Sequence, residues 1–203
     1  MKRTKHIDLV SMRKAPKPFD YKPLVVAVTA GSLIGCSDDV QEVKIYHDAE
    51  QCAANHPSQV AECELAYKEA VEKAAQSGPK YNSMSACTDD FGPSNCGVYQ
   101  SSNNQSYFMP FMSGFMFSSI INQGSRSAPL YTSFSRRSPA YNNWVSTDGV
   151  LYGNAFKRNL KVPNNAFKEK PAVKRTMSRG GFGSTIAAKS NFGGKSSRSS
   201  WGG

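Results

Sequence analysis

The sequence is poor in the side chains that many enzymes use for catalysis and in the apolar residues that fill a large core. Its 203 residues include 3 His and 2 Trp, and hydrophobic residues make up 39% of the chain. An average soluble domain reaches roughly 45–50%, counted with Gly. No apolar run approaches the roughly 18 residues of a transmembrane helix, which excludes a polytopic membrane protein. With so little apolar surface, the chain is not expected to pack all of its residues into one core.

Acidic residues are nearly absent from the second half of the chain. Residues 97–203 contain 14 Lys+Arg against 2 Asp+Glu, a net charge of +12. Residues 36–96 have the opposite balance, 4 Lys+Arg against 11 Asp+Glu, a net charge of −7. The total of +10 therefore describes an acidic part followed by a basic part, and a binding partner would meet that polarity.

The N-terminus is basic and is followed by a short uncharged stretch at residues 24–35. Twelve residues reach about 18 Å as a helix, which is too short to cross a bilayer but suits the apolar region of a signal peptide. The stretch runs into Leu33-Ile34-Gly35-Cys36, which resembles the lipobox of bacterial lipoproteins. The sequence therefore predicts a lipoprotein-type signal peptide at residues 1–35, with lipid attached to Cys36.

Ser37 follows the predicted lipid-bearing cysteine. Enterobacterial lipoproteins that stay in the inner membrane typically carry Asp at this position, so the resemblance favours the outer membrane. We expect a protein on the periplasmic side of the cell envelope, held to the membrane by its lipid anchor.

The four remaining cysteines form an even set, which in an exported chain indicates two disulfides with three possible connectivities. A tyrosine stands six positions before Cys52 and before Cys87, and the next cysteine follows 11 or 9 residues later, at Cys63 or Cys96. This internal repeat favours Cys52–Cys63 and Cys87–Cys96, although sequence alone leaves the other pairings open.

A zinc site made of His47, Cys52, His56 and Cys63 is the alternative use of the first cysteine pair. Its ligand types suit zinc, but the chain has no Cys-x2–4-Cys or His-x3–5-His pair. We therefore expect no metal and no cofactor, and we interpret both histidines as surface residues.

Helical signals are concentrated between the cysteines. Asp48 can cap a helix, residues 60–75 place Val60, Cys63 and Tyr67 on one stripe together with two alanines, and a third helix is predicted from Ser83 to residue 91. These helices and the disulfides predict an acidic, disulfide-stapled helical module at residues 36–98.

The rest of the chain is rich in turn-forming residues, because 41 of residues 97–203 are Ser, Gly or Asn. We interpret residues 99–106 as a linker, 107–122 as a Met/Phe-rich apolar segment and 123–203 as a basic low-complexity tail. The apolar segment is predicted to be a short helix that packs or self-associates through residues 107–121. Its insertion into a membrane interface or docking of an envelope partner is the alternative.

The expected fold class is therefore mainly α. A small disulfide-stapled helical module is followed by a largely disordered Ser/Gly/Asn-rich basic tail, with a short apolar helix and a candidate β-hairpin at residues 144–152 around Asp148-Gly149.

Several motifs together resemble the YgiB family of uncharacterised enterobacterial proteins, which are described as predicted lipoproteins. The resemblance covers nearly the whole chain and includes the lipobox-like segment, the Tyr-x5-Cys repeat, the Met-Pro-x-Met-x-Gly core at 109–114, Ser138-Pro139-Ala140-Tyr141 and Arg179-Gly180-Gly181-Phe182-Gly183. It implies no known activity, catalytic residue or cofactor.

The function that follows is a structural or binding role at the cell envelope, without an assignable reaction. No Ser-His-Asp, paired-carboxylate or phosphate-loop motif is recognisable, so we expect no enzyme. An anionic envelope component is the expected partner of the basic tail. The alternative is a cytoplasmic or membrane-associated protein that binds nucleic acid or another polyanion through that tail. Nucleic acid is the less favoured partner because an exported chain would not meet it.

Overall fold

The computed structural model describes residues 40–100, 105–120 and 124–193. The chain divides into two units, residues 1–36 and 37–203, and all described residues belong to the second. In chain order the elements are β1 (Val40–Tyr46), α1 (Ala49–Asn55), α2 (Val60–Ser77), α3 (Met84–Phe91), β2 (Cys96–Gln100), β3 (Ser106–Pro110), β4 (Gly114–Ile120), β5 (Gly124–Tyr131), β6 (Asn143–Ser146), β7 (Leu151–Asn154), β8 (Asn159–Pro163), a 3-10 helix (Asn164–Phe167) and α4 (Gly181–Gly193).

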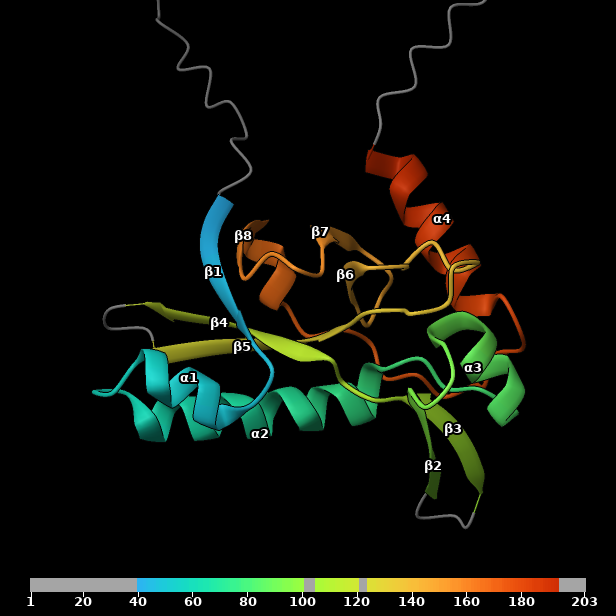
Figure 1. Ribbon diagram of the computed structural model, residues 1–203, viewed down its shortest axis with the longest axis horizontal. Helices are drawn as coiled ribbons and strands as arrows, with labels where there is room; N and C mark the ends of the chain where they lie inside the picture. The colour runs from blue at the N-terminus through green and yellow to red at the C-terminus, as the bar shows by residue number, and fades with distance from the viewer. Residues whose placement is uncertain (1–39, 101–104, 121–123, 194–203) are drawn as a thin grey trace, which may run out of the picture. The chain divides into compact units, whose positions relative to one another are not determined.

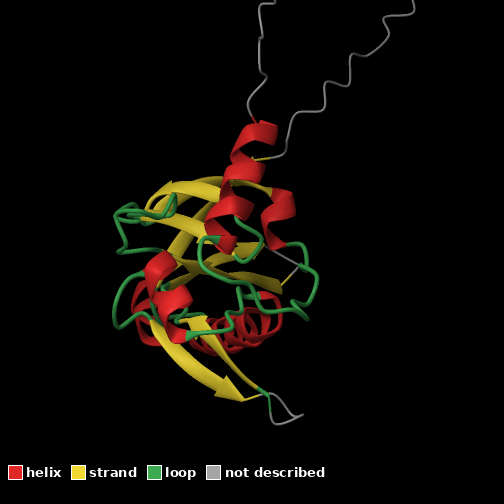
Figure 2. Ribbon diagram, turned by 90° about the vertical axis from the view of Figure 1, so that its right-hand side faces the viewer, coloured by secondary structure: helices red, strands yellow, loops and turns green. Residues whose placement is uncertain are grey.

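Six of the strands form one antiparallel sheet in the order β7-β6-β5-β4-β1-β8. The first strand of the unit therefore lies between β4 and β8, so the sheet joins the start of the folded unit to its later part. Helix α2 runs beneath β4 and β5 (Figure 1). Strands β2 and β3 form a separate hairpin that extends away from the six-stranded sheet (Figure 2).

The three helices predicted between residues 48 and 91 are present, and their ends show why they form. Asp48 caps α1 by accepting a hydrogen bond from the Gln51 amide at 2.7 Å, and the Ser83 hydroxyl caps α3 in the same way. The buried face of α2 consists of Cys63 and small residues, Ala66, Ala70, Ala74 and Ser77. Val60, predicted to be on the buried stripe, is 45% exposed.

The prediction of a mainly α fold is wrong, and its apolar segment shows the reason. Residues 107–121 were expected to form a helix, but the described part forms β3 and β4. In β4, Phe115 and Phe117 pack in the core cluster that contains Ala66 and Ala70 of α2. Met116 packs in a separate cluster with Ile45, Leu130 and Trp144. A strand buried on both faces has a continuous apolar run, and such a run cannot be distinguished from a buried helix by its periodicity.

The prediction of a largely disordered tail is also wrong. Residues 124–163 supply four of the six strands of the main sheet, and the Ser/Gly-rich end forms α4. Phe182 and Ile186, one helical turn apart in α4, are both buried in a core cluster that also contains Phe91 and Tyr131. The burial of these two side chains stabilises the packing of an otherwise polar segment against the rest of the fold.

The hairpin expected around Asp148-Gly149 is formed by β6 and β7. The Gly149 amide donates to the Ser146 carbonyl and the Ser146 amide to the Val150 carbonyl, the pattern of a three-residue loop. Gly149 has a φ of +85°, and a Cβ there would lie 3.0 Å from the Thr185 side chain of α4. Glycine is needed at this position for both its backbone conformation and the close approach of the helix.

Three clusters of buried side chains form the core, and the same elements contribute to more than one of them. Neighbouring strand residues such as Trp144 and Val145 point to different clusters. Within residues 40–100, 105–120 and 124–193, no helix has both the length and the apolar character needed to cross a membrane.

Candidate functional site

The four cysteines of the folded unit lie where the sequence repeat favoured them. Cys52 is bonded to Cys63 and Cys87 to Cys96, and all four side chains are buried. The first bond joins α1 to α2, and the second joins α3 to β2. Cys36, the predicted lipid attachment residue, lies outside the described residues, so its modification stays a prediction.

The two histidines of the zinc alternative have protein partners. His56 Nε2 lies 2.8 Å from the Tyr46 hydroxyl, and burial lowers the pKa of His56 below its usual 6.5, with Lys44 adding to the effect. His47 Nδ1 lies 2.7 Å from the Ser113 carbonyl oxygen. Because Cys52 and Cys63 share a disulfide, their sulfur atoms cannot act as thiolate ligands.

One group of Ser, Glu and Lys side chains meets at the contact between α2 and β5. The Ser127 hydroxyl donates to Glu69 Oε2 at 2.8 Å, and Lys73 Nζ lies 2.7 Å from Glu69 Oε1. Lys73 also donates to the Ser127 carbonyl at 2.9 Å. Ser127 is fully buried, so a substrate cannot reach its hydroxyl, and the network ties the helix to the sheet.

A cavity of about 460 Å³ is the strongest candidate site, and we call it the aromatic groove. Its volume lies in the range of small-ligand pockets. Its apolar walls come from Phe111, Met112, Phe134, Trp144, Ala155 and Phe156, and its polar lining from His47, Asn95, Ser113, Thr132, Asn142 and Arg158. The cavity therefore combines apolar surface with a small set of groups that can hydrogen-bond.

The rim of the groove is made of phenylalanines that the fold leaves uncovered. Phe111 is 49% exposed, Phe134 59% and Phe156 78%. They come from the β3–β4 connection, from the segment after β5 and from the β7–β8 connection. An isolated exposed apolar residue is ordinary, but three partly exposed aromatic rings at one cavity form an apolar surface of the kind found at binding sites.

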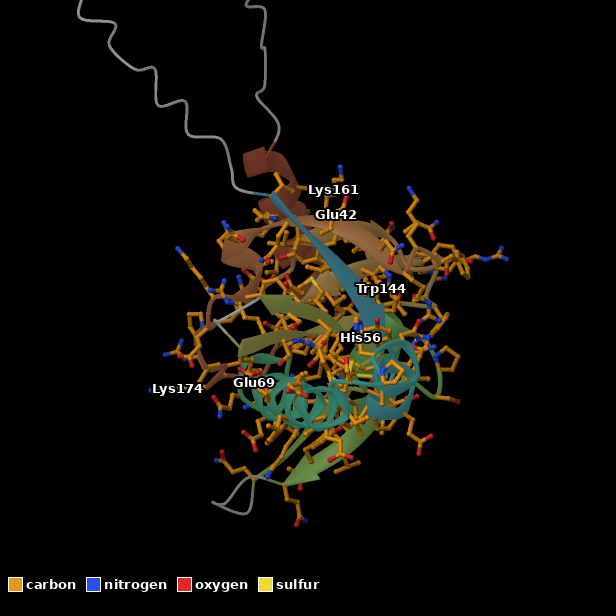
Figure 3. The ribbon with its side chains drawn as sticks, turned by 90° about the vertical axis from the view of Figure 1, so that its left-hand side faces the viewer. Glu42, His56, Glu69, Trp144, Lys161 and Lys174 are labelled. Carbon is orange, nitrogen blue, oxygen red and sulfur yellow. A yellow bond between two sulfur atoms is a disulfide. The ribbon has the colours of Figure 1, made fainter. Side chains whose placement is uncertain are left out.

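The base of the groove is held by short hydrogen bonds. Trp144, which is almost fully buried, donates its indole N–H to the Lys157 carbonyl at 2.9 Å and lies in the interior behind β1 (Figure 3). A carbonyl oxygen can only accept, so His47 donates through Nδ1 to the Ser113 carbonyl. Arg158 donates to the Gln51 side chain at 3.3 Å. These contacts join the end of the β7–β8 connection to β6 and to α1, and they join His47, just before α1, to the β3–β4 connection.

Two residues of the groove, Thr132 and Asn142, have features that lower the free energy of unfolding: an unpaired buried hydroxyl within the described residues and a left-handed backbone conformation. The buried Thr132 hydroxyl has no hydrogen-bond partner in the part of the chain that the structure describes. Leaving such a group unpaired costs about 1–3 kcal/mol. Asn142 has a φ of +51°, in the left-handed region, which most non-glycine residues avoid and which Asn adopts more readily than most. Unpaired groups and strained backbone are concentrated at functional sites.

Sequence reasoning did not find the groove, because its phenylalanines come from segments interpreted as a flexible tail or as a packed apolar helix. Phe134, Asn142 and Phe156 belong to the predicted low-complexity tail, and Phe111 to the predicted apolar helix. The available signal was local: each phenylalanine stands among Ser, Asn, Gly or Pro, where an aromatic residue has no evident role in a flexible chain.

The chain has close relatives in enterobacteria. The UPF0441 proteins of Klebsiella pneumoniae (strain 342) and Yersinia pestis bv. Antiqua (strain Antiqua) are each 35% identical to it, over 207 and 211 residues. The alignments cover 95% of this chain and 93% and 92% of the relatives. The UPF0441 protein of Serratia proteamaculans (strain 568) is 32% identical over 206 residues, covering 95% of this chain and 94% of the relative.

No solved structure matches the chain. A family model described as "Protein of unknown function (DUF1190)" matches residues 40–193, a range that contains both disulfides and the whole aromatic groove. The chain therefore belongs to the DUF1190 family.

Proposed function

We propose that the protein is a lipid-anchored binding protein of the cell envelope, with the aromatic groove as its ligand site. The observation that carries the binding role is a 460 Å³ cavity that has exposed phenylalanines at its rim and, in its lining, a buried Thr132 hydroxyl that has no partner among the described residues. The proposal assigns no reaction to the site.

Two features support the envelope as the location. Disulfides persist in oxidising compartments such as the periplasm, and both disulfides of this chain are buried in the folded unit. The lipobox-like segment that ends at Cys36 stands directly before that unit. The resemblance to the YgiB family, whose members are described as predicted lipoproteins, points the same way.

The chemistry of the groove favours an extended polypeptide segment as its ligand. An apolar side chain would lie between the rim phenylalanines and bury aromatic surface. The amides of Asn95 and Asn142 each offer a donor and an acceptor, which matches the donor and acceptor of a peptide unit. Arg158, at the same cavity, adds a cation for a peptide carboxylate.

Binding can be tested with the purified full-length chain and fluorescent decapeptides that carry a central Phe, Leu or Ser. We expect Phe and Leu peptides to bind and Ser peptides to bind at least tenfold more weakly. The double variant Phe134→Ser/Phe156→Ser should lose the difference, because both rings are more than half exposed and their removal leaves the core intact. The control Leu65→Ser changes an equally exposed residue of α2 outside the groove. Equal peptide binding by the double variant and the control would refute the ligand site.

The anchor has a separate test. In cells fed with labelled palmitate, the wild-type chain is expected to incorporate label and to fractionate with the outer membrane. The variant Cys36→Ser should do neither, whereas Cys52→Ala with Cys63→Ala should still be labelled. Label in the Cys36→Ser variant would exclude this residue as the lipid attachment site.

A further inference from the structure

A second cavity, of about 620 Å³, lies away from the aromatic groove, and we call it the basic cleft. Three cations line it, Lys80, Lys174 and Arg175. Uncharged donors come from Asn82, Gln105, Ser106 and Thr176, and Tyr107 forms part of the wall. None of the residues that line this cavity is acidic. Lys174 projects outward at the edge of the view in Figure 3, well apart from Trp144.

The backbone holds the cations of the cleft in place. The segment that carries Lys174 and Arg175 is fixed at its start by the Val173 amide, which donates to the Gln76 carbonyl at 2.9 Å. At its end, the Met177 amide donates to the Lys80 carbonyl at 2.7 Å. The cations therefore project from a segment that is hydrogen-bonded on both sides.

The opposite wall is equally well fixed. Tyr81 exchanges backbone hydrogen bonds with Phe108 of β3, at 2.7 and 3.0 Å. Its buried hydroxyl donates to Asp90 at 2.8 Å. Lys80 and Asn82 stand on either side of this anchored residue, so their positions are set by the core.

The charges of the cleft are not neutralised within the described residues. No carboxylate lies within ion-pair distance of Lys80, Lys174 or Arg175 in the part of the chain that the structure describes. Lys80 Nζ lies 5.0 Å from the centre of the Tyr107 ring, and burial lowers its pKa. A bound anion would offset this unfavourable burial of charge.

Another cationic cavity shows the contrast. Arg136, Arg137 and Arg179 line it together with Asp89 and Asp90, and Arg179 Nε lies 3.0 Å from Asp89. Carboxylates thus occupy that cavity, whereas the basic cleft offers its cations and donors to a ligand.

We propose that the basic cleft binds a phosphate group. Three cations and four uncharged side chains offer more donors than the two oxygens of a carboxylate can accept, whereas a phosphate has three or four oxygens and a larger charge. The favoured source is the headgroup of an anionic phospholipid. This choice of source rests on the proposed lipid anchor, which would hold the folded unit near a membrane surface; the phosphate chemistry does not depend on it.

The test compares two triple variants of the full-length chain that lose the same charge. The cleft variant is Lys80→Gln/Lys174→Gln/Arg175→Gln. The control is Arg136→Gln/Arg137→Gln/Lys161→Gln, which changes exposed cations outside the cleft. Both carry Cys36→Ser so that no lipid anchor contributes, and both must melt within a few degrees of the parent. The probes are inorganic phosphate, acetate, vesicles of phosphatidylglycerol in phosphatidylcholine, and single-stranded RNA.

We expect the cleft variant to lose roughly fivefold in vesicle affinity per cation removed, on the order of a hundredfold in total. The control variant should lose less than about tenfold in vesicle affinity. The parent should bind phosphate more tightly than acetate. If the variants differ with phosphate but bind vesicles equally, a free phosphate replaces the lipid as the source and the lipid proposal falls. A cleft-dependent preference for RNA over vesicles would likewise overturn the lipid source. Equal losses in both variants with every probe, or acetate bound as tightly as phosphate, would overturn the phosphate site itself.

These results are independent of the tests of the proposed function. Palmitate labelling at Cys36 and peptide binding at the aromatic groove involve none of the three cleft cations. If the basic cleft does not bind phosphate, palmitate labelling and peptide binding are still expected. If Cys36 carries no lipid, phosphate binding by the cleft is still expected.

Discussion

At the scale of single residues, two adjacent hydroxyls at the end of β5 are in opposite situations. The Thr132 hydroxyl is buried and unpaired within the described residues, whereas the buried Ser133 hydroxyl donates to the Asp90 carbonyl at 2.7 Å. Replacing Thr132 with Val keeps the shape and removes the unpaired group. We expect Thr132→Val to leave the free energy of unfolding unchanged or to raise it by up to about 1 kcal/mol.

The neighbouring variant is the matched control. Ser133→Ala leaves the Asp90 carbonyl without this donor and should lower the free energy of unfolding by about 1–3 kcal/mol. Urea denaturation followed by circular dichroism measures both. A loss of more than about 1 kcal/mol in Thr132→Val would show that its hydroxyl is paired, and the groove would lose one of its two costly features.

His56 sets a pH dependence of stability. Burial and the nearby Lys44 lower its pKa in the folded chain below 6.5, so the unfolded chain binds a proton more readily. Stability contributed by the neutral ring is therefore present above about pH 6.5 and is lost as the pH falls through the folded-state pKa. The variant His56→Gln should show a smaller decrease in the free energy of unfolding between about pH 7.5 and pH 5.5. Parallel curves for the two chains would contradict the assignment.

At the scale of single residues, prediction from the sequence succeeded where a side chain interacts with residues close to it along the chain. Asp48 caps the helix that begins next to it, and Cys52 and Cys87 each pair with the next cysteine along the chain. Thr132 could not be found in this way, because its unpaired hydroxyl depends on which distant groups the fold brings near it.

At the scale of elements, Asp148 joins three separate parts of the chain. Its carboxylate accepts from the Ser146 hydroxyl at 2.7 Å and lies 3.3 Å from Lys170 and 3.7 Å from Lys189 of α4. Burial alone would raise its pKa, but the hydrogen bond and the two lysines more than offset this, and the pKa lies below its usual 3.8. The residue thus connects the β6–β7 hairpin to α4.

The variant Asp148→Asn should loosen that connection. At neutral pH we expect a loss of about 1–2 kcal/mol in the free energy of unfolding, since one charge-assisted hydrogen bond and two partly exposed ion pairs are weakened. A lowered carboxyl pKa stabilises above the unfolded-state value and ceases to do so below the folded-state value. The curves of the two chains should therefore converge in acid, and α4 amides should exchange faster in the variant at neutral pH. A constant difference across the acid range would point to packing instead of charge.

The disulfide between α1 and α2 closes a short loop, with the two cysteines 11 positions apart. Loop-closure entropy for this length corresponds to about 3 kcal/mol of stability. The double variant Cys52→Ala/Cys63→Ala should lose at least that amount, because two buried side chains also become smaller. Thermal unfolding under oxidising conditions measures the loss. A change of less than about 1 kcal/mol would mean that the unfolded chain gains little freedom from removing this bond.

As with single residues, helices and strands were predicted correctly from the sequence only where the signal is local. Helices α2 and α3 were found because their faces and caps are local patterns. The strands β3 and β4 were missed because their partners are distant in sequence or unreadable from it. Phe115, Met116 and Phe117 of β4 are buried among residues from β1, α2 and β5, and β3 pairs with β2. Fully apolar runs favour a helix or a buried strand equally, and only their partners decide between them.

At the scale of the whole molecule, the low apolar content proved compatible with an extensive core. The part of the chain with the most Ser, Gly and Asn contributes Leu130, Trp144, Val162 and Phe182, all nearly or fully buried. These side chains are widely spaced along the sequence, and composition averages over them. Charge polarity was visible in the sequence, but the placement of Lys80 beside Lys174 and Arg175 required the fold, because the first residue comes from the acidic half.

The sharing of elements among the core clusters predicts how the folded unit unfolds. Helix α2 places Ala70 in one cluster and Ala74 in another, and β6 does the same with Trp144 and Val145. One cluster cannot lose its packing without moving an element that another cluster needs, so a single cooperative transition is expected. With Trp201→Phe, Trp144 becomes the only tryptophan of the chain, and its fluorescence then reports on the cluster that contains no α2 residue. Far-ultraviolet circular dichroism is dominated by the α-helices, whose buried residues belong to the other two clusters. Urea transitions followed by the two signals should coincide in midpoint and slope; separate midpoints would mean that the sheet and α2 can unfold independently.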